Sequence, residues 1–221
     1  MQRVGQAGRT YINAATGCFF VLLTTTITAH CQDSTYLVRS GVHPTKVIPF
    51  TERYQYPKFQ RGVLHFYAGE KSEEFLLNYN HFAQQIQLID PKGDTVALDN
   101  KMSIVEFIQI QSDFYFKDLR QGYLLVLTKE EPLNLMKRIR WKSVYFPNGE
   151  SSFQKVYEYF FLAPPNKAHK AEKSSLTKLF PDNRNEINKY VSERKFDFTS
   201  ESDLRDIVSF CNGLAISNNQ K

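Results

Sequence analysis

The stretch "SIVEFIQIQSDFYFK", residues 103 to 117, decides the fold class. It holds two short runs rich in β-branched and aromatic residues, separated by a polar pair, a pattern typical of antiparallel strands. Ile104, Ile108 and Ile110 recur at even spacing with Glu106 interrupting them, which predicts one buried face and one solvated face. The stretch therefore predicts two neighbouring strands of an antiparallel sheet.

Similar runs continue on both sides of this stretch. Turn residues separate short apolar runs at residues 62–67, 73–80, 84–90, 94–99 and 122–128. Within "DPKGD" (90–94), Pro91 and Gly93 suit a hairpin turn, whereas a calcium loop would need several more oxygen ligands at regular spacing. The sequence predicts sheet over residues 36–162.

The pattern changes after Pro164 and Pro165, which end the last strand and open a basic connector. Residues 172–213 contain three short amphipathic stripes with helical spacing, the last of them ended by Gly213. Because such short helices cannot bury their apolar stripes alone, we expect them to pack on the sheet. The predicted class is α+β: an antiparallel β-sheet region followed by a short C-terminal helical segment packed on it, in one domain of residues 32–221.

The N-terminus has the features of a secretory signal peptide. Arg3 and Arg9 precede an uncharged stretch, residues 14–29, that is apolar at its centre. A membrane-spanning helix, the alternative, needs about 20 apolar residues, and several threonines dilute this shorter stretch. We predict a signal peptide over residues 1–31.

Two processing routes remain open at the end of this segment. Ala29 and Cys31 supply the small residues that signal peptidase I requires, which favours cleavage after Cys31. Lipoprotein processing would instead retain an acylated Cys31, but the bulky His30 precedes it. The prediction is an exported protein, periplasmic or on the cell surface, and soluble rather than lipid-anchored at Cys31.

Cleavage at this point changes both charge and cysteine content. The formal charge falls from +5 to +3, because Arg3 and Arg9 are lost and no acid is. So mild a charge does not indicate nucleic acid as a partner. Of three cysteines only Cys211 remains, so no intramolecular disulfide can form.

Two segments resemble a known group of proteins. They are "FLLNYNHFAQQIQLIDPKGDTVALDN" (75–100) and "LTKLFPDNRNEINKYVSERKFDFTSESDLRDIVSF" (176–210). They resemble the two halves of uncharacterised secreted proteins of Bacteroidetes-type bacteria, which pair a β-rich N-terminal part with a Leu-Phe-Pro helical C-terminal tail. The resemblance implies secretion and a β-then-α order, and it implies no catalytic or binding residues.

The sequence contains no motif for metal binding or catalysis. No pair among its histidines has the spacing of a zinc site, and glycine-rich nucleotide-binding and G-x-S-x-G patterns are absent. A carboxylate pair could still assemble from distant strands, as in glycosidases. We therefore predict no metal and no cofactor, leave catalytic residues unassigned, and regard enzymatic activity as the weaker hypothesis.

One basic segment suggests binding. In "MKRIRWK" (136–142), a strand would place Arg138, Arg140 and Lys142 on one face and Trp141 on the other. Arginine forks suit carboxylate and phosphate groups, so this row could bind an anionic glycan, a lipid headgroup or an envelope protein. The alternative is a solvated strand face with Trp141 packed in the core.

Together these features predict a non-catalytic, exported binding or accessory module of the cell envelope. An envelope hydrolase with a dispersed carboxylate site is one alternative. A structural accessory of an outer-membrane complex is another. The sequence does not predict the oligomeric state.

Overall fold

The computed structural model describes residues 35–98 and 104–218. The predicted signal peptide, residues 1–31, and the choice of processing at Cys31 lie outside the described residues. The strands are β1 (Thr35–Val38), β2 (Gln60–Phe66), β3 (Phe75–Asn80), β4 (Gln85–Ile89), β5 (Thr95–Ala97), β6 (Val105–Ile110), β7 (Asp113–Asp118), β8 (Gly122–Val126), β9 (Asn134–Tyr145), β10 (Ser151–Ala163) and β11 (Lys167–Lys170). The helices are the 3-10 helix η1 (Pro44–Lys46), α1 (Phe50–Arg53), α2 (Lys173–Leu179), α3 (Arg184–Arg194) and α4 (Glu201–Asn218).

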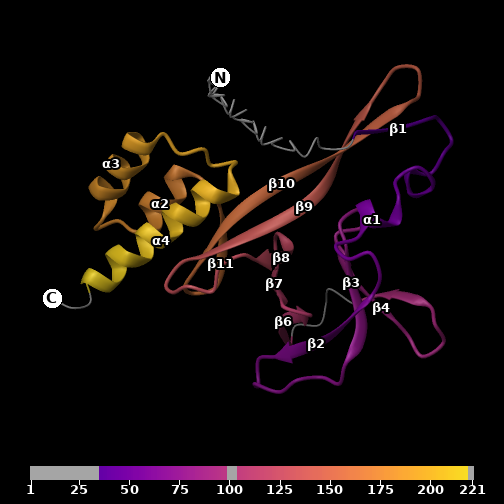
Figure 1. Cartoon of the computed structure of the whole chain (residues 1–221), viewed down its shortest axis with the longest axis horizontal. Coiled ribbons are helices and arrows are strands. Elements are labelled where there is room, and N and C mark those ends of the chain that lie inside the picture. The colour runs from indigo at the N-terminus through magenta and orange to yellow at the C-terminus, as the bar shows by residue number, and fades with distance from the viewer. Residues whose placement is uncertain (1–34, 99–103, 219–221) are drawn as a thin grey trace, which may run out of the picture. The chain divides into compact units, whose positions relative to one another are not determined.

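The strands form one antiparallel sheet (Figure 1). Its order is β1-β10-β9-β8-β7-β6-β2-β3-β4-β5, and β11 pairs with β10 off this path. Most neighbours are consecutive in sequence, as expected of hairpins and meanders. The predicted antiparallel sheet with a few helices is confirmed, and each predicted run between residues 62 and 128 contains a strand.

β6 contains an irregularity that changes which of its residues are buried. Its register with β2 shifts by one residue at Glu106, which has no partner across the ladder. The extra residue reverses the alternation, so Val105 is buried together with Ile108 and Ile110. Ile104 is 60% exposed. The expectation that Ile104 shares the buried face was wrong, because the interruption at Glu106 is a β-bulge.

The long β9–β10 hairpin has two chemically different faces. Each pair of directly opposed residues shares a face, and each pair joins two odd-numbered or two even-numbered residues. Odd-numbered side chains of both strands therefore lie on one face and even-numbered side chains on the other. On one face, Leu135 and Phe161 are fully buried and belong to a hydrophobic cluster that includes Leu176, Ile187 and Leu204 of the three C-terminal helices. We call this the helix face. The other face, with even-numbered residues, carries Met136 and the predicted basic row, and we call it the row face.

Polar contacts also join the hairpin to α4. The Asn212 side chain donates from Nδ2 to the Leu133 carbonyl at 2.9 Å and accepts from the Leu133 N–H at 2.9 Å. Lys137 Nζ lies 2.9 Å from Glu201 Oε2. Asn212 therefore satisfies both backbone groups of a fully buried residue.

Two details of the C-terminal region differ from expectation. The connector after Pro165 contains β11, which pairs with β10, because Asn166 at φ 60° closes a short hairpin. α4 does not end at Gly213 but continues to Asn218. Gly213 costs only about 1 kcal/mol relative to alanine inside a helix, and Leu214 beyond it packs against the helix-face cluster. No helix within residues 35–98 and 104–218 combines the length and apolarity needed to cross a membrane.

Candidate functional site

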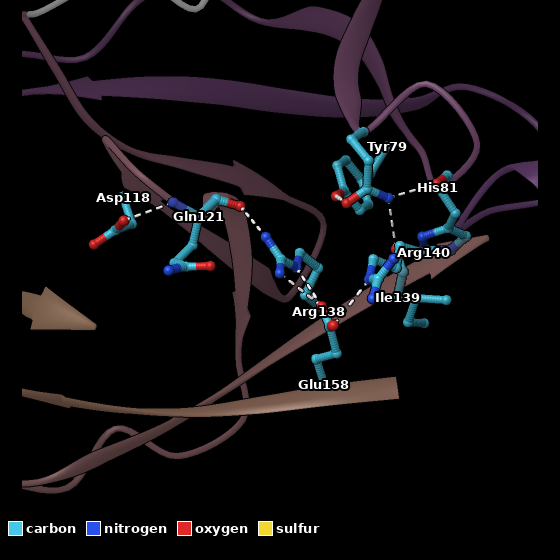
Figure 2. A network of polar contacts seen from close by, with 9 residues as sticks. Tyr79, His81, Asp118, Gln121, Arg138, Ile139, Arg140 and Glu158 are labelled. Atoms are coloured by element: carbon cyan, nitrogen blue, oxygen red, sulfur yellow. Dashed lines mark hydrogen bonds and ion pairs between the residues drawn. The ribbon is translucent and has the colours of Figure 1, made fainter. Parts of the chain in front are cut away.

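The predicted basic row lies on the row face of β9. Arg138, Arg140 and Lys142 point one way, and Trp141 points the other. Figure 2 shows both arginines directed at Glu158 of β10. Arg138 Nη2 lies 2.6 Å from Glu158 Oε2, and Arg140 Nε donates to Glu158 Oε1 at 2.8 Å. One carboxylate thus bridges two guanidinium groups.

This bridge controls the charge of the row. Partial burial alone would raise the pKa of Glu158, but the hydrogen bonds and charges of Arg140 and Arg138 outweigh it and lower that pKa. Glu158 therefore stays ionised at neutral pH and cancels one of the two arginine charges. Lys142 is exposed and forms no ion pair with any described residue. The row keeps a net charge of +2.

Further hydrogen bonds hold the bridge in place (Figure 2). Arg138 Nη1 donates to the Gln121 carbonyl at 2.7 Å, and the Gln121 N–H donates to Asp118 at 2.8 Å. On the other side of β9, Gln84 Nε2 donates to the Ile139 carbonyl at 2.8 Å. Arg138 is therefore held by two segments of the chain, Arg140 is held by Glu158, and Gln84 holds the β9 backbone between them. Such support is expected of structural residues and equally of a preorganised anion site.

Trp141 belongs to a separate aromatic cluster on the helix face. Its ring lies 5.7 Å from Tyr36 and 6.4 Å from Phe82. The Lys155 ammonium, paired with Glu52 at 2.8 Å, lies 5.7 Å from the centre of the indole ring. The structure thus does not bring Trp141 together with the three cations of the row.

Burial holds two titratable side chains, His81 and Cys211, in their neutral forms. His81 is buried, and desolvation together with the charges of Lys155 and Lys137 lowers its pKa to about 3, so it is neutral. Burial raises the pKa of the Cys211 thiol to about 12, which disfavours the reactive thiolate. Among the described residues, no three histidine, cysteine or acidic side chains gather as metal ligands.

The row face also carries a pocket that sequence reasoning missed. It is open to solvent and has a volume of about 470 Å³. Its apolar lining comes from consecutive strands of the sheet: Phe107 of β6, Phe114 and Phe116 of β7, Val126 of β8, Met136 of β9 and Leu162 of β10. Binding pockets for small molecules are usually concave and mostly apolar and have volumes of about 300–1,000 Å³. This pocket matches that description in its volume and its apolar lining.

The mouth of the pocket is charged. Lys129 Nζ lies 3.3 Å from the centroid of the Phe114 ring, a cation–π contact. Glu131 and Asn134 complete the polar part of the lining. Lys129 and Glu131 are both exposed, and neither forms an ion pair with another described residue. The pocket therefore combines an aromatic floor with one available cation and one available anion.

Comparison with known proteins adds no relative: no family model, curated protein or solved structure matches the chain. The kinship with secreted proteins of Bacteroidetes-type bacteria stays a prediction.

Proposed function

We propose that the chain is a non-catalytic binding module of the cell envelope, and that the pocket on the row face binds the apolar part of an anionic amphiphile. In this proposal residues 1–31 direct export, and residues 32–221 form the mature protein. The C-terminal helices pack on the helix face as part of the same domain. The observation that carries the function is the phenylalanine-lined pocket beside Lys129.

The floor of the pocket favours binding without a large rearrangement. Met136 and Leu162 are buried, and both belong to the central β9–β10 ladder. Phe107 and Phe116 form a directly opposed pair across β6 and β7. A site built on paired strands keeps its shape, so an apolar ligand loses water contact without the cost of ordering loops.

The mouth favours an anionic group at one end of the ligand. Lys129 carries a full charge that no described acid neutralises, so a carboxylate or phosphate beside it would gain a charge-assisted hydrogen bond. Glu131, two residues further along the same segment of the lining, would repel the same group and so favour its contact with Lys129. An acyl chain or aromatic group with a single acidic end matches this arrangement.

The basic row extends this proposal along the same face. Met136 lines the pocket, and Arg138, Arg140 and Lys142 follow at every second position of β9. Successive even-numbered residues are about 6.6 Å apart along a strand. We propose that larger ligands, such as anionic glycolipids, also contact Arg140 and Lys142.

The hydrolase alternative finds less support. A glycosidase needs two carboxyl groups facing one cleft, one of them with a raised pKa. The described lining of the pocket includes one carboxylate, Glu131. Where the pKa of a described carboxyl is displaced, as in Glu158, Asp197 and Glu201, it is lowered. These carboxylates suit ion pairs and turns rather than proton donation.

A fluorescence titration with 11-(dansylamino)undecanoate, an anionic amphiphile, tests the proposal. We expect saturable binding that decanoate competes away. Val126→Phe should weaken binding at least tenfold, because the larger side chain occupies the pocket while preserving its apolar character. Leu119→Ala is the matched control, because Leu119 is 94% exposed and lies outside this lining. No saturable binding, or equal affinity in both variants, would rule out the pocket as the binding site.

A further inference from the structure

The end of the β9–β10 hairpin is a surface distinct from the pocket. β8 pairs with β9 only at Met136 and Lys137. Residues 142–145 of β9 pair with residues 151–154 of β10, and those in turn pair with β1. Beyond the β8 ladder, β1 is therefore the one described strand that pairs with the hairpin. We call this end, residues 37–47 and 142–150, the tip.

Two turns meet at the tip. Gly149, at φ 81°, closes the turn between β9 and β10, where the Phe146 N–H donates to the Glu150 carbonyl at 2.9 Å. The turn after β1 is closed by the Val42 N–H, which donates to the Arg39 carbonyl at 3.1 Å. A Cβ placed on Gly149 would lie 3.1 Å from the Ser40 hydroxyl oxygen. The two turns are therefore in close contact.

The tip exposes an unusual amount of apolar surface. Tyr145 is 76% exposed, Leu37 54%, Val144 47% and Phe146 42%. Near its start the same strand, β9, is buried: Leu135 is fully inaccessible and Met136 is 2% exposed. By the pairing register, Leu37 and Val144 lie on the row face and Tyr145 lies on the opposite face, so these side chains surround the end of the hairpin. Single exposed apolar residues are ordinary, but a group of them around one end of a hairpin indicates an interaction surface.

The charges around this apolar group have one dominant sign. Arg39, Lys46 and Lys142 are exposed. The one acid within residues 37–47 and 142–150 is Glu150, which is half-buried and accepts a hydrogen bond from Asn148. An apolar centre with a cationic margin is complementary to an anionic lipid surface, where tyrosine and phenylalanine enter the headgroup region and cations meet phosphates.

We propose that the tip docks the protein onto a membrane that contains anionic lipids. Tyr145 and Phe146 enter the interfacial layer, and Arg39 and Lys142 contact lipid phosphates. A protein partner fits less well, because the cores of protein interfaces are depleted in lysine, whereas Lys142 lies next to Val144 on the same face. The inference goes beyond the proposed pocket function, does not rest on it, and has one residue, Lys142, in common with the basic row proposed there.

Tryptophan fluorescence can test docking at a single position. Trp141 is the only tryptophan of the chain, so Trp141→Phe combined with Tyr145→Trp places the sole indole at the tip. The full chain is mixed with phosphatidylglycerol–phosphatidylcholine vesicles whose acyl chains are brominated. We expect a blue shift and quenching at position 145. The matched control, Trp141→Phe with Leu119→Trp, places the indole in the β7–β8 turn and should change little.

The design separates the tip from other routes to the membrane. If the protein bound the vesicles and the indole at position 145 were not quenched, the proposal would be overturned, because another segment of the chain would then contact the lipid. A blue shift that depends on protein concentration and not on vesicles would show self-association and would also overturn it. Val126→Phe should bind vesicles normally, so failure at the pocket and failure at the tip are distinguishable.

A charge reversal gives a second measurement that retains Trp141. Arg39→Glu with Lys142→Glu should lower vesicle partitioning at least 25-fold, since each cation near an anionic surface contributes about fivefold. Both side chains are exposed, so the fold should be unaffected. Circular dichroism checks folding in each variant. Unchanged partitioning of this double variant would contradict the proposal.

Discussion

Replacing Asn212 with alanine should destabilise the protein strongly, because this side chain satisfies a buried stretch of backbone. It makes two hydrogen bonds of 2.9 Å to the N–H and carbonyl of Leu133, a fully buried residue. Each of the two buried backbone groups that is left without a partner costs about 1–3 kcal/mol, or about 2–6 kcal/mol together. Alanine regains about 0.5 kcal/mol of helix propensity. We expect a net loss of about 1.5–5.5 kcal/mol in the free energy of unfolding.

Urea unfolding followed by circular dichroism measures this loss. Asn185→Ala is the matched control, because Asn185 is an exposed asparagine within α3 and should change stability by less than about 0.5 kcal/mol. The Asn212 result also tests whether α4 is docked on the sheet in solution. If Asn212→Ala were as stable as Asn185→Ala, the docked arrangement and the one-domain proposal would both be refuted.

Two further predictions concern pH. Glu158→Gln should destabilise the protein by about 1 kcal/mol near neutral pH, after allowance for partial exposure, because Arg138 and Arg140 lose their shared carboxylate. The pKa of Glu158 in the folded state is lowered from 4.5, so its stabilisation of the fold is present above pH 4.5 and is lost as the pH falls through the folded-state pKa. Urea unfolding at several pH values should therefore show that the free energy of unfolding of Glu158→Gln falls less steeply in acid than that of the wild type. His81, with a folded pKa of about 3 against 6.5 when unfolded, should lower stability as pH falls from 6.5 toward 3, since the unfolded state binds the extra proton. The NMR signals of the His81 ring protons should not shift above about pH 4. Urea unfolding of His81→Gln at several pH values should show a free energy of unfolding that depends less on pH than that of the wild type.

Much of the fold could be predicted from periodicity. In a strand, apolar and polar side chains alternate according to which face is buried, and this alternation correctly predicts strands in the runs between residues 62 and 128. The bulge at Glu106 could not be placed, because it depends on pairing with β2 rather than on local pattern. The continuation of α4 past Gly213 was missed for a similar reason: tertiary packing of Leu214 overrides a weak local preference.

The site was only partly predictable. Alternation correctly separated Arg138, Arg140 and Lys142 from Trp141. It could not reveal that Glu158, on the partner strand, neutralises one charge of the row. The pocket did leave a signal in "DFYFK", where Phe114 and Phe116 alternate with the buried Tyr115 and so occupy the face expected to be polar.

Methyl NMR of Met136 is the most direct test of the pocket. Its side chain lines the pocket, and the protein's two other methionines lie outside the described residues. With methyl-labelled methionine and added decanoate, we expect nuclear Overhauser effects between the acyl chain protons and the Met136 methyl group. These effects should disappear in Val126→Phe. Decanoate that binds without any effect at Met136, or that does not bind at all, would show that the pocket is not the binding site.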